Sequence, residues 1–142
     1  MQVETVNLKN WGPARRYRTI KAWQKADDLA VRIYERTRTF PKDEQYALIS
    51  QMRRAGISVA ANIVEGSSRR SRQEYVQFLS IAKASLSEVS YYLHLSKRLS
   101  YLSELEFQQL NDACEETARV LFGLLRFVAK TDPDVSVLKS GV

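Results

Sequence analysis

The sequence contains few of the residues that organise disulfide-bonded, zinc-binding or turn-rich folds. Its 142 residues include one cysteine, Cys114, and one histidine, His94. A single cysteine excludes an intramolecular disulfide, and the two residues together supply too few ligands for a Cys/His zinc site. Only five glycines and three prolines are present. This scarcity argues against an all-β fold, in which tight turns depend on those two residue types.

Long apolar runs and phosphate-binding motifs are missing as well. No stretch approaches the ~20 apolar residues that cross a bilayer, and the N-terminal segment lacks the apolar core of a signal peptide. We therefore expect no membrane partner, and the lone cysteine favours the reducing cytoplasm. The scattered glycines form neither a P-loop nor a G-x-G-x-x-G motif, so the sequence predicts no cofactor.

Candidate catalytic groups are isolated from one another. The neighbours of His94 at helical spacing are Ser90 and Lys97, and neither orients a catalytic imidazole the way a carboxylate would. Cys114 falls in an apolar stripe and is typical of a small buried side chain. The acids Glu104, Glu106, Asp112, Glu115 and Glu116 lack the Glu-x-x-His pair of a di-iron bundle. We expect no metal site and no enzymatic activity.

Helical periodicity is the strongest positive signal. Apolar residues recur at steps of three and four in four segments, 22–38, 43–65, 71–98 and 103–130. Gly66 stands where a left-handed residue would end the second segment, and capping boxes at Ser71–Glu74 and Ser103–Glu106 open the third and fourth. Short connections predict an all-α, up-down-up-down antiparallel four-helix bundle. We assign residues 1–21 to a flexible basic N-terminal arm, 22–130 to the bundle and 131–142 to a frayed tail.

The second segment is apolar around roughly 200° of its circumference, more than one core-facing stripe requires. The third carries a second apolar patch beside its core stripe. Such surfaces favour self-association, whereas the alternative is that neighbouring helices cover the edges. The predicted interface between copies comprises Ile57, Ala60, Val64, Ile81, Tyr91, Leu95 and Leu99.

The opposite side of the second segment is polar and consists of Gln51, Arg54, Ser58, Asn62 and Glu65. These five residues, the polar strip below, lie within ~80° of one another on a helix. They form either a recognition surface or a solvated face.

Positive charge is concentrated in two places. The chain has 22 Lys and Arg against 16 Asp and Glu, for a net charge of +6. Residues 1–21 and 53–72 each have five basic residues against one acidic residue. Arginine favours bidentate contacts with phosphate. The candidate nucleic-acid contacts are Arg69, Arg70 and Arg72, supported by Arg53 and Arg54, with Arg15, Arg16 and Arg18 in the arm. The alternative is a solubilising surface without a ligand.

Several short blocks occur in a characteristic order: Ala22-Trp23-Gln24-Lys25-Ala26, Phe40-Pro41, Gln51-Met52-Arg53-Arg54-Ala55, Asn62-Ile63-Val64-Glu65-Gly66, then Arg72, Phe78-Leu79 and Ile81-Ala82. Together they resemble the bacterial four-helix-bundle proteins encoded within 23S ribosomal RNA intervening sequences. The likeness runs from about residue 18 to 130. Val64 departs from the alanine that is commoner in the family.

The resemblance implies an up-down bundle that assembles as a homopentamer and has no catalytic activity. RNA binding has been attributed to members encoded beside ribosomal RNA. A related group serves as accessory subunits of retroelement reverse transcriptases. Two hypotheses follow: an oligomer that binds RNA or another nucleic acid through arginines, or a scaffold for an acidic or polymerase-like protein with no direct nucleic-acid role.

Overall fold

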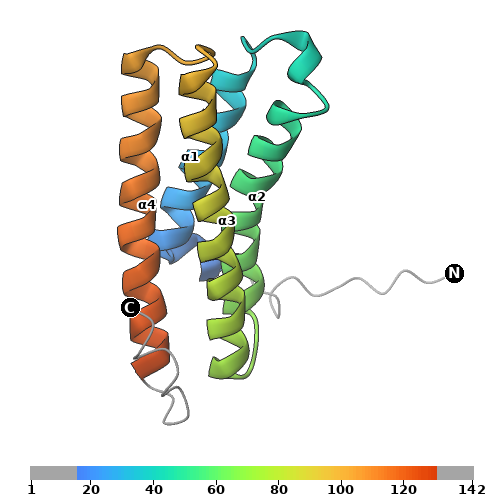
Figure 1. The fold of residues 1–142 in the computed structure, drawn as a ribbon. Coiled ribbons are helices and arrows are strands. Elements are labelled where there is room, and N and C mark those ends of the chain that lie inside the picture. Colours follow the sequence, from blue (N-terminus) through green and yellow to red (C-terminus); the bar gives the residue numbers. More distant parts are fainter. Residues whose placement is uncertain (1–15, 131–142) are drawn as a thin grey trace, which may run out of the picture.

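The structure, a computed structural model, describes residues 16–130 and has four long helices (Figure 1). They are α1 (Lys21–Thr37), α2 (Leu48–Ser67), α3 (Arg72–Arg98) and α4 (Glu104–Lys130), with a short 3-10 helix, η2 (Lys42–Glu44), between α1 and α2. No strand occurs in residues 16–130. The predicted all-α class is therefore confirmed, whereas most of the predicted arm and all of the predicted tail lie outside the described residues.

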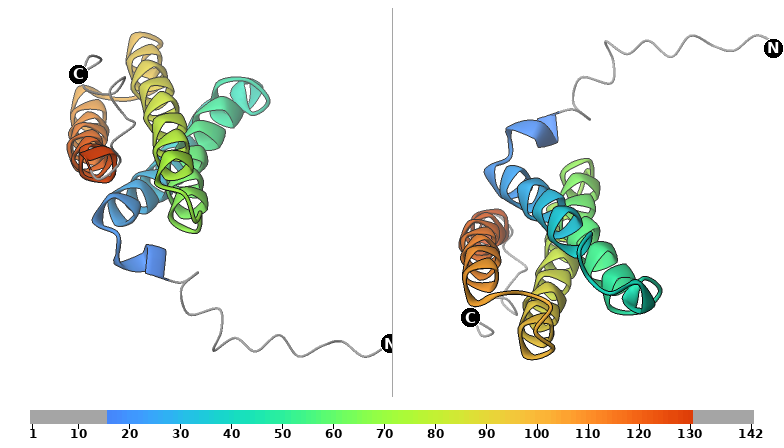
Figure 2. Two further views of the ribbon diagram at one scale, coloured as in Figure 1. Left: turned by 90° about the horizontal axis from the view of Figure 1, so that it is seen from below. Right: turned by 90° about the horizontal axis from the view of Figure 1, so that it is seen from above.

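The four helices run alternately up and down and form a closed ring of neighbours. α1 packs against α2, α2 against α3, α3 against α4, and α4 against α1. The turns before α2 and α4 lie at one end of the bundle, and the turn between α2 and α3 lies at the other (Figure 1). Views along the bundle show that the helix axes are inclined to one another (Figure 2).

The predicted apolar stripes meet in one core. Side chains with at most 2% of their surface exposed come from every helix: Leu29 and Ile33 from α1, Met52, Val59 and Ile63 from α2, Leu79, Val89 and Leu93 from α3, and Leu110 and Leu121 from α4. Two buried hydroxyls bond to carbonyls of their own helix: Thr37 donates to the Ile33 carbonyl at 2.7 Å, and Ser96 donates to the Tyr92 carbonyl at 2.7 Å. Among the described residues, every buried side-chain nitrogen or oxygen has a partner.

The predicted start of the second helix at residue 43 is wrong. Lys42–Glu44 form a 3-10 turn, and α2 begins only at Leu48. Ala47, the residue before α2, has φ −120° and ψ −103°, which breaks the helical path. Its methyl side chain offers no capping oxygen. The negative charges of Asp43 and Glu44 therefore belong to η2, and residues 45–47 form an exposed connection.

The predicted role of Gly66 as a left-handed terminator is also wrong. Gly66 lies inside α2, and no glycine of residues 16–130 has a positive φ. A Cβ atom at this position would come within 2.9 Å of the Phe78 Cβ and 3.3 Å of the Tyr75 carbonyl oxygen. Glycine is therefore required because α2 and α3 approach closely near their shared turn.

The two predicted capping boxes differ in the structure. At Ser103 the bonds are reciprocal: the Glu106 backbone N–H donates to the Ser103 hydroxyl at 3.1 Å, and the Ser103 N–H donates to the Glu106 carboxylate at 3.0 Å. At Ser71 only the bond from the Glu74 N–H is present in the described chain, at 3.3 Å. The turn into α4 is thus fixed more firmly than the turn into α3.

Candidate nucleic-acid interface

The half of the bundle that holds the α2–α3 turn is strongly basic. It comprises residues 16–25 at the start of α1, 65–75 around the turn, and 124–130 at the end of α4, which lie in the same half in Figure 1. These segments, here called the basic end, contain nine Lys and Arg residues and two acids, Glu65 and Glu74. An excess of this size attracts polyanions over several ångströms.

The three arginines of the turn differ in how they are held. Arg69 forms an ion pair with Glu65 one helical turn earlier, and its guanidinium lies 4.7 Å from the centre of the Phe78 ring. Arg70 and Arg72 are exposed and have no ion-pair or hydrogen-bond partner among residues 16–130. These two guanidinium groups therefore keep all their donors available to a ligand.

The arm arginines are only partly within the described chain, because Arg15 lies outside it. Arg16 and Arg18 are exposed on a 3-10 turn over residues 16–19. The Arg18 guanidinium is 5.8 Å from the centre of the Tyr17 ring, which meets Trp23 edge-on at 4.9 Å. The start of α1 thus adds cations beside aromatic surface to the basic end.

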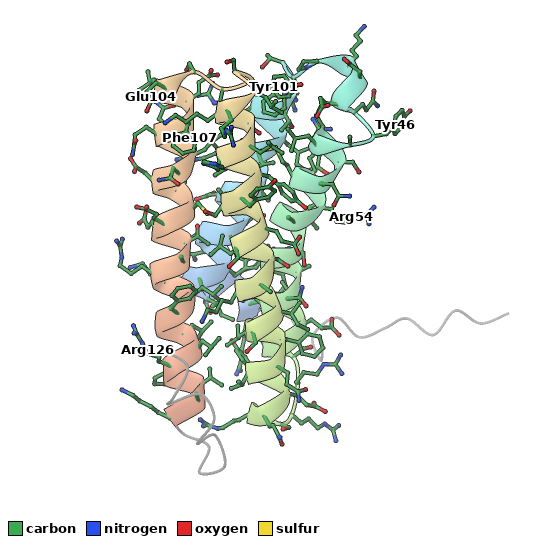
Figure 3. All side chains as sticks on the ribbon, in the orientation of Figure 1. Tyr46, Arg54, Tyr101, Glu104, Phe107 and Arg126 are labelled. Atoms are coloured by element: carbon green, nitrogen blue, oxygen red, sulfur yellow. The ribbon has the colours of Figure 1, made fainter. Side chains whose placement is uncertain are left out.

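Arg53 and Arg54 are not brought together with the turn arginines. Arg54 lies 13 residues before Ser67, the last residue of α2, which is about 20 Å along the helix, and Arg69 lies beyond that end. Arg53 is held against α1: its Nε donates to the Thr37 hydroxyl at 3.0 Å, and its guanidinium stacks 4.5 Å from the centre of the Tyr34 ring. Arg54 is exposed and points away from the bundle (Figure 3).

The residues predicted to join copies of the chain divide into two groups. Ile57, Ile81, Tyr91 and Leu99 are exposed, between 45% and 57% of their surface. Ala60, Val64 and Leu95 are half-buried. In a single copy, neighbouring helices do not cover the four large exposed side chains.

The middle of the polar strip joins two helices. The Ser58 and Ser85 hydroxyls share a hydrogen bond of 2.7 Å between α2 and α3. Asn62 donates from Nδ2 to the Ser58 carbonyl at 2.8 Å and to its hydroxyl at 3.0 Å. Gln51, Arg54 and Glu65 are exposed. The strip is therefore neither one recognition surface nor one solvated face, because its centre serves packing between α2 and α3.

The candidate catalytic groups stay apart in the structure. His94 is exposed, and Cys114 is buried. Burial, and to a lesser extent the charge of Glu115, raises the pKa of the Cys114 thiol to about 11. A thiol with so high a pKa is a poor nucleophile near neutral pH. Residues 16–130 contain no group of three or more His, Cys, Asp or Glu side chains placed to hold a metal ion.

Several acids of α4 pair with bases on the same chain. Glu104 lies 3.1 Å from Lys97, Glu106 lies 3.4 Å from Arg36, and Glu116 lies 3.0 Å from Lys25. The hydrogen bond from Lys25, together with its charge, lowers the pKa of Glu116. These three carboxylates are therefore already engaged on their own chain.

Sequence reasoning missed a groove at the other end of the bundle. It measures about 450 Å³ and is lined by Tyr34, Gln45, Tyr46, Ile49, Ser50, Arg53, Arg54 and Ile57. Tyr46, at its rim, is 91% exposed. The groove was missed because residue 46 was predicted to lie within a helix. The break in apolar periodicity over residues 41–47 could have indicated a connection there instead.

Comparison with known proteins gives a family assignment. The family model described as 23S rRNA-intervening sequence protein matches residues 18–123. The chain belongs to this family. The match includes Arg53, Arg54 and the three arginines of the α2–α3 turn, and it leaves Arg15 and Arg16 outside. The predicted resemblance is thus confirmed.

A solved structure supports the same assignment. The chain is similar to a protein of unknown function from the S23 ribosomal protein family of Bacteroides thetaiotaomicron VPI-5482, with 25% sequence identity and a TM-score of 0.68. The match covers 74% of this chain and 95% of the other. A search of curated proteins finds no match. None of the helices described in residues 16–130 is long and apolar enough to cross a membrane.

Proposed function

We propose that this member of the 23S rRNA-intervening sequence protein family is a non-enzymatic, self-associating bundle that binds RNA or another nucleic acid through phosphates. The observation that carries the proposal is the pair Arg70 and Arg72, free and exposed in a region with nine bases and two acids. Guanidinium groups with all donors free suit bidentate phosphate contacts. The reducing cytoplasm, where RNA is found, is the compartment we infer for it.

Self-association is the second part of the proposal, and the exposed apolar residues of α2 and α3 support it. Ile57, Ile81, Tyr91 and Leu99 each leave 45–57% of their surface in water, and exposed apolar side chains gathered on one surface are typical of contacts between proteins. The family resemblance implies five subunits, which would repeat the basic end five times around a common axis. Repetition would strengthen binding to one long polyanion by raising the effective concentration of each site.

Salt dependence and charge removal test the nucleic-acid proposal. We expect the logarithm of the association constant for a structured RNA to fall linearly with the logarithm of salt concentration. Changing Arg69, Arg70 and Arg72 to Ala should reduce that slope by about one for each lost contact. The matched control changes Arg38, Lys42 and Arg98 to Ala, which removes the same charge from exposed positions at the opposite end.

The comparison of the two triple variants decides between hypotheses. Weaker binding in the turn variant alone supports the proposal. Equal binding by the turn variant and the unmodified protein contradicts it. A scaffold for an acidic or polymerase-like protein is then favoured if that partner is retained after nuclease treatment.

Sedimentation tests assembly separately. We expect a mass near five times the 16.3 kDa of one chain. Ile57→Glu and Tyr91→Glu should each release single chains, because a buried unpaired carboxylate is costly at an interface. Val31→Glu, at a position 50% exposed on α1, is the control. Single chains of the unmodified protein at micromolar concentration would contradict assembly.

A further inference from the structure

The groove between α1 and the start of α2 combines flat aromatic surface with positive charge. Its floor includes Tyr34 with Arg53 stacked on it, the guanidinium 4.5 Å from the ring centre. Gln45 and Ser50 add neutral polar groups, and Tyr46 and Arg54 stand at its edges. The volume of about 450 Å³ lies within the range of small-molecule sites.

The side chains that line the groove carry positive charge and no negative charge. Two arginines line it, and no described lining residue is an aspartate or glutamate. The acids next to lining residues in the chain are Glu35 and Glu44. Glu35 lines a separate cavity with Arg36 and Gln109. Burial, followed by the charges of Glu44 and Asp43, raises the pKa of Tyr101, which packs on Phe40. Tyr46 and Tyr101 lie on different sides of this end of the molecule (Figure 3).

Tyr46 is the most exposed of the large apolar side chains in the described residues, at 91%. It lies in the short connection 45–47, so its ring has water on both faces. Arg54 projects from the second turn of α2 on the same side of the bundle (Figure 3). An exposed ring and an unpaired guanidinium that line one groove suit a ligand that has both a flat ring and a negative charge. A nucleotide has both.

We propose that this groove binds one segment of single-stranded nucleic acid, with a base stacked on Tyr46 and the adjoining phosphate held by Arg54. The groove would be a second region of contact with nucleic acid, besides the basic end. It rests on the proposed function in one respect, namely that the ligand is a nucleic acid. Bases in a single strand are free to stack on aromatic side chains, whereas bases in a duplex are not. The groove therefore discriminates single strands from duplexes, which the basic end does not.

The experiment measures binding of two fluorescein-labelled probes by anisotropy: a 10-nucleotide RNA without internal pairing, and the same RNA paired with its complement. The variants are Tyr46→Ala, Tyr46→Phe and Arg54→Ala in the full chain. Leu105→Ala, which removes a side chain 68% exposed on α4 at the same end, is the matched control. Circular dichroism and sedimentation of every variant check folding and assembly.

Because only an unpaired base can stack on Tyr46, the variants at this residue should affect the single strand and not the duplex. Tyr46→Ala should weaken single-strand binding by about tenfold and change duplex binding by less than about twofold. Tyr46→Phe keeps the ring and should bind like the unmodified protein. Arg54→Ala should lower the salt slope for the single strand by about 0.7. Leu105→Ala should have no effect on either probe.

Failure of this inference is distinguishable from failure of the proposed function. Unchanged single-strand binding in Tyr46→Ala overturns the groove proposal and leaves the basic end untouched. An equal loss for both probes also overturns it, because stacking cannot act on a duplex. Since Ile57 lines the groove, a change in sedimentation mass with unchanged RNA affinity identifies a contact between copies and overturns the proposal too. Loss of binding only in the variant of Arg69, Arg70 and Arg72 supports the proposed function alone.

Discussion

The two ends of the bundle use arginine in different ways. At the basic end, Arg70 and Arg72 have no partner in the described chain, and bases outnumber acids by nine to two. At the opposite end, here called the mixed-charge end (residues 34–54 and 97–107), seven bases face five acids. There Arg36 pairs with Glu106, Lys97 pairs with Glu104, and Arg53 lies on Tyr34. Arg36 and Arg53 therefore support the fold at the mixed-charge end, whereas Arg70 and Arg72 are free for a ligand at the basic end.

The first prediction concerns how tightly the helices approach at the basic end. Gly66→Ala should destabilise the protein by about 2 kcal/mol, because the added methyl meets the Phe78 Cβ and the Tyr75 carbonyl, which can move only with α3. Gly123→Ala is the control: nothing lies within 4 Å of its added methyl, and the change should stabilise α4 by about 0.5–1 kcal/mol. Urea unfolding measures both. Equal effects would mean that α2 and α3 are not in close contact there.

The second prediction separates two adjacent arginines by their contacts. Arg53→Ala should lower the free energy of unfolding by about 1–2 kcal/mol, because it removes a bond to Thr37 and a ring stack on Tyr34. Arg54→Ala should change it by less than about 0.5 kcal/mol, as should Arg70→Ala at the basic end. Thermal unfolding of the three variants measures the contrast. A cost for Arg70→Ala as large as that for Arg53→Ala would remove the distinction between the ends.

The third prediction compares the two helix caps. Ser103→Ala should cost about 1 kcal/mol, because it removes the 3.1 Å bond from the Glu106 N–H to the hydroxyl and leaves only one half of the box. Ser71→Ala removes a longer bond of 3.3 Å and should cost about 0.5 kcal/mol. Each variant is the control for the other, because both replace the serine at the start of a helix with alanine. Chemical unfolding measures both, and a larger cost at Ser71 would contradict the geometry described above.

The fourth prediction uses pH at the mixed-charge end. Bonds from the Ser103 backbone N–H and hydroxyl, and to a lesser extent the charge of Arg36, lower the pKa of Glu106 below its ordinary value of 4.5. The ionised carboxylate therefore stabilises the fold above about pH 4.5, and this contribution is lost as pH falls through the lower folded-state pKa. Glu106→Ala should be less stable by about 0.5 kcal/mol at pH 7 and equal to the unmodified protein near pH 2. A difference that persists at pH 2 would contradict this assignment.

The sequence alone was sufficient for the architecture because periodicity records which side chains face the core. The stripes that contain Leu29, Val59 and Leu93 predicted four helices, and each of these residues is buried. The start of α2 was missed because Asp43 and Glu44 suit a helix start electrostatically, whereas the backbone angles of Ala47 break the path. The break in apolar periodicity over residues 41–47 was the local sign of this interruption.

The sequence predicted which arginines the candidate site contains, but not which of them are free to bind a ligand. Counting charges identified Arg69, Arg70 and Arg72 together, but only the structure shows that Arg69 is tied to Glu65 while the other two are free. Likewise, helix spacing grouped Ser58 with Arg54 as one polar strip, although Ser58 bonds to Ser85 of α3. Partners that are distant in the chain, such as Ser85, decide whether a polar side chain is available to a ligand.

The hydrogen bond between the Ser58 and Ser85 hydroxyls also fixes where α2 lies along the length of α3. A slide of one turn, about 5.4 Å, would move Gly66 away from Phe78, where only glycine fits, and would also break the bond between the two hydroxyls. The Ser85 hydroxyl would then lose its bond to Ser58 while Ser85 is only 8% exposed, and a buried hydroxyl without a partner costs about 1–3 kcal/mol. This contact and the close approach at Gly66 together fix the position of α3 along α2, and with it the position of Arg72, the first residue of α3.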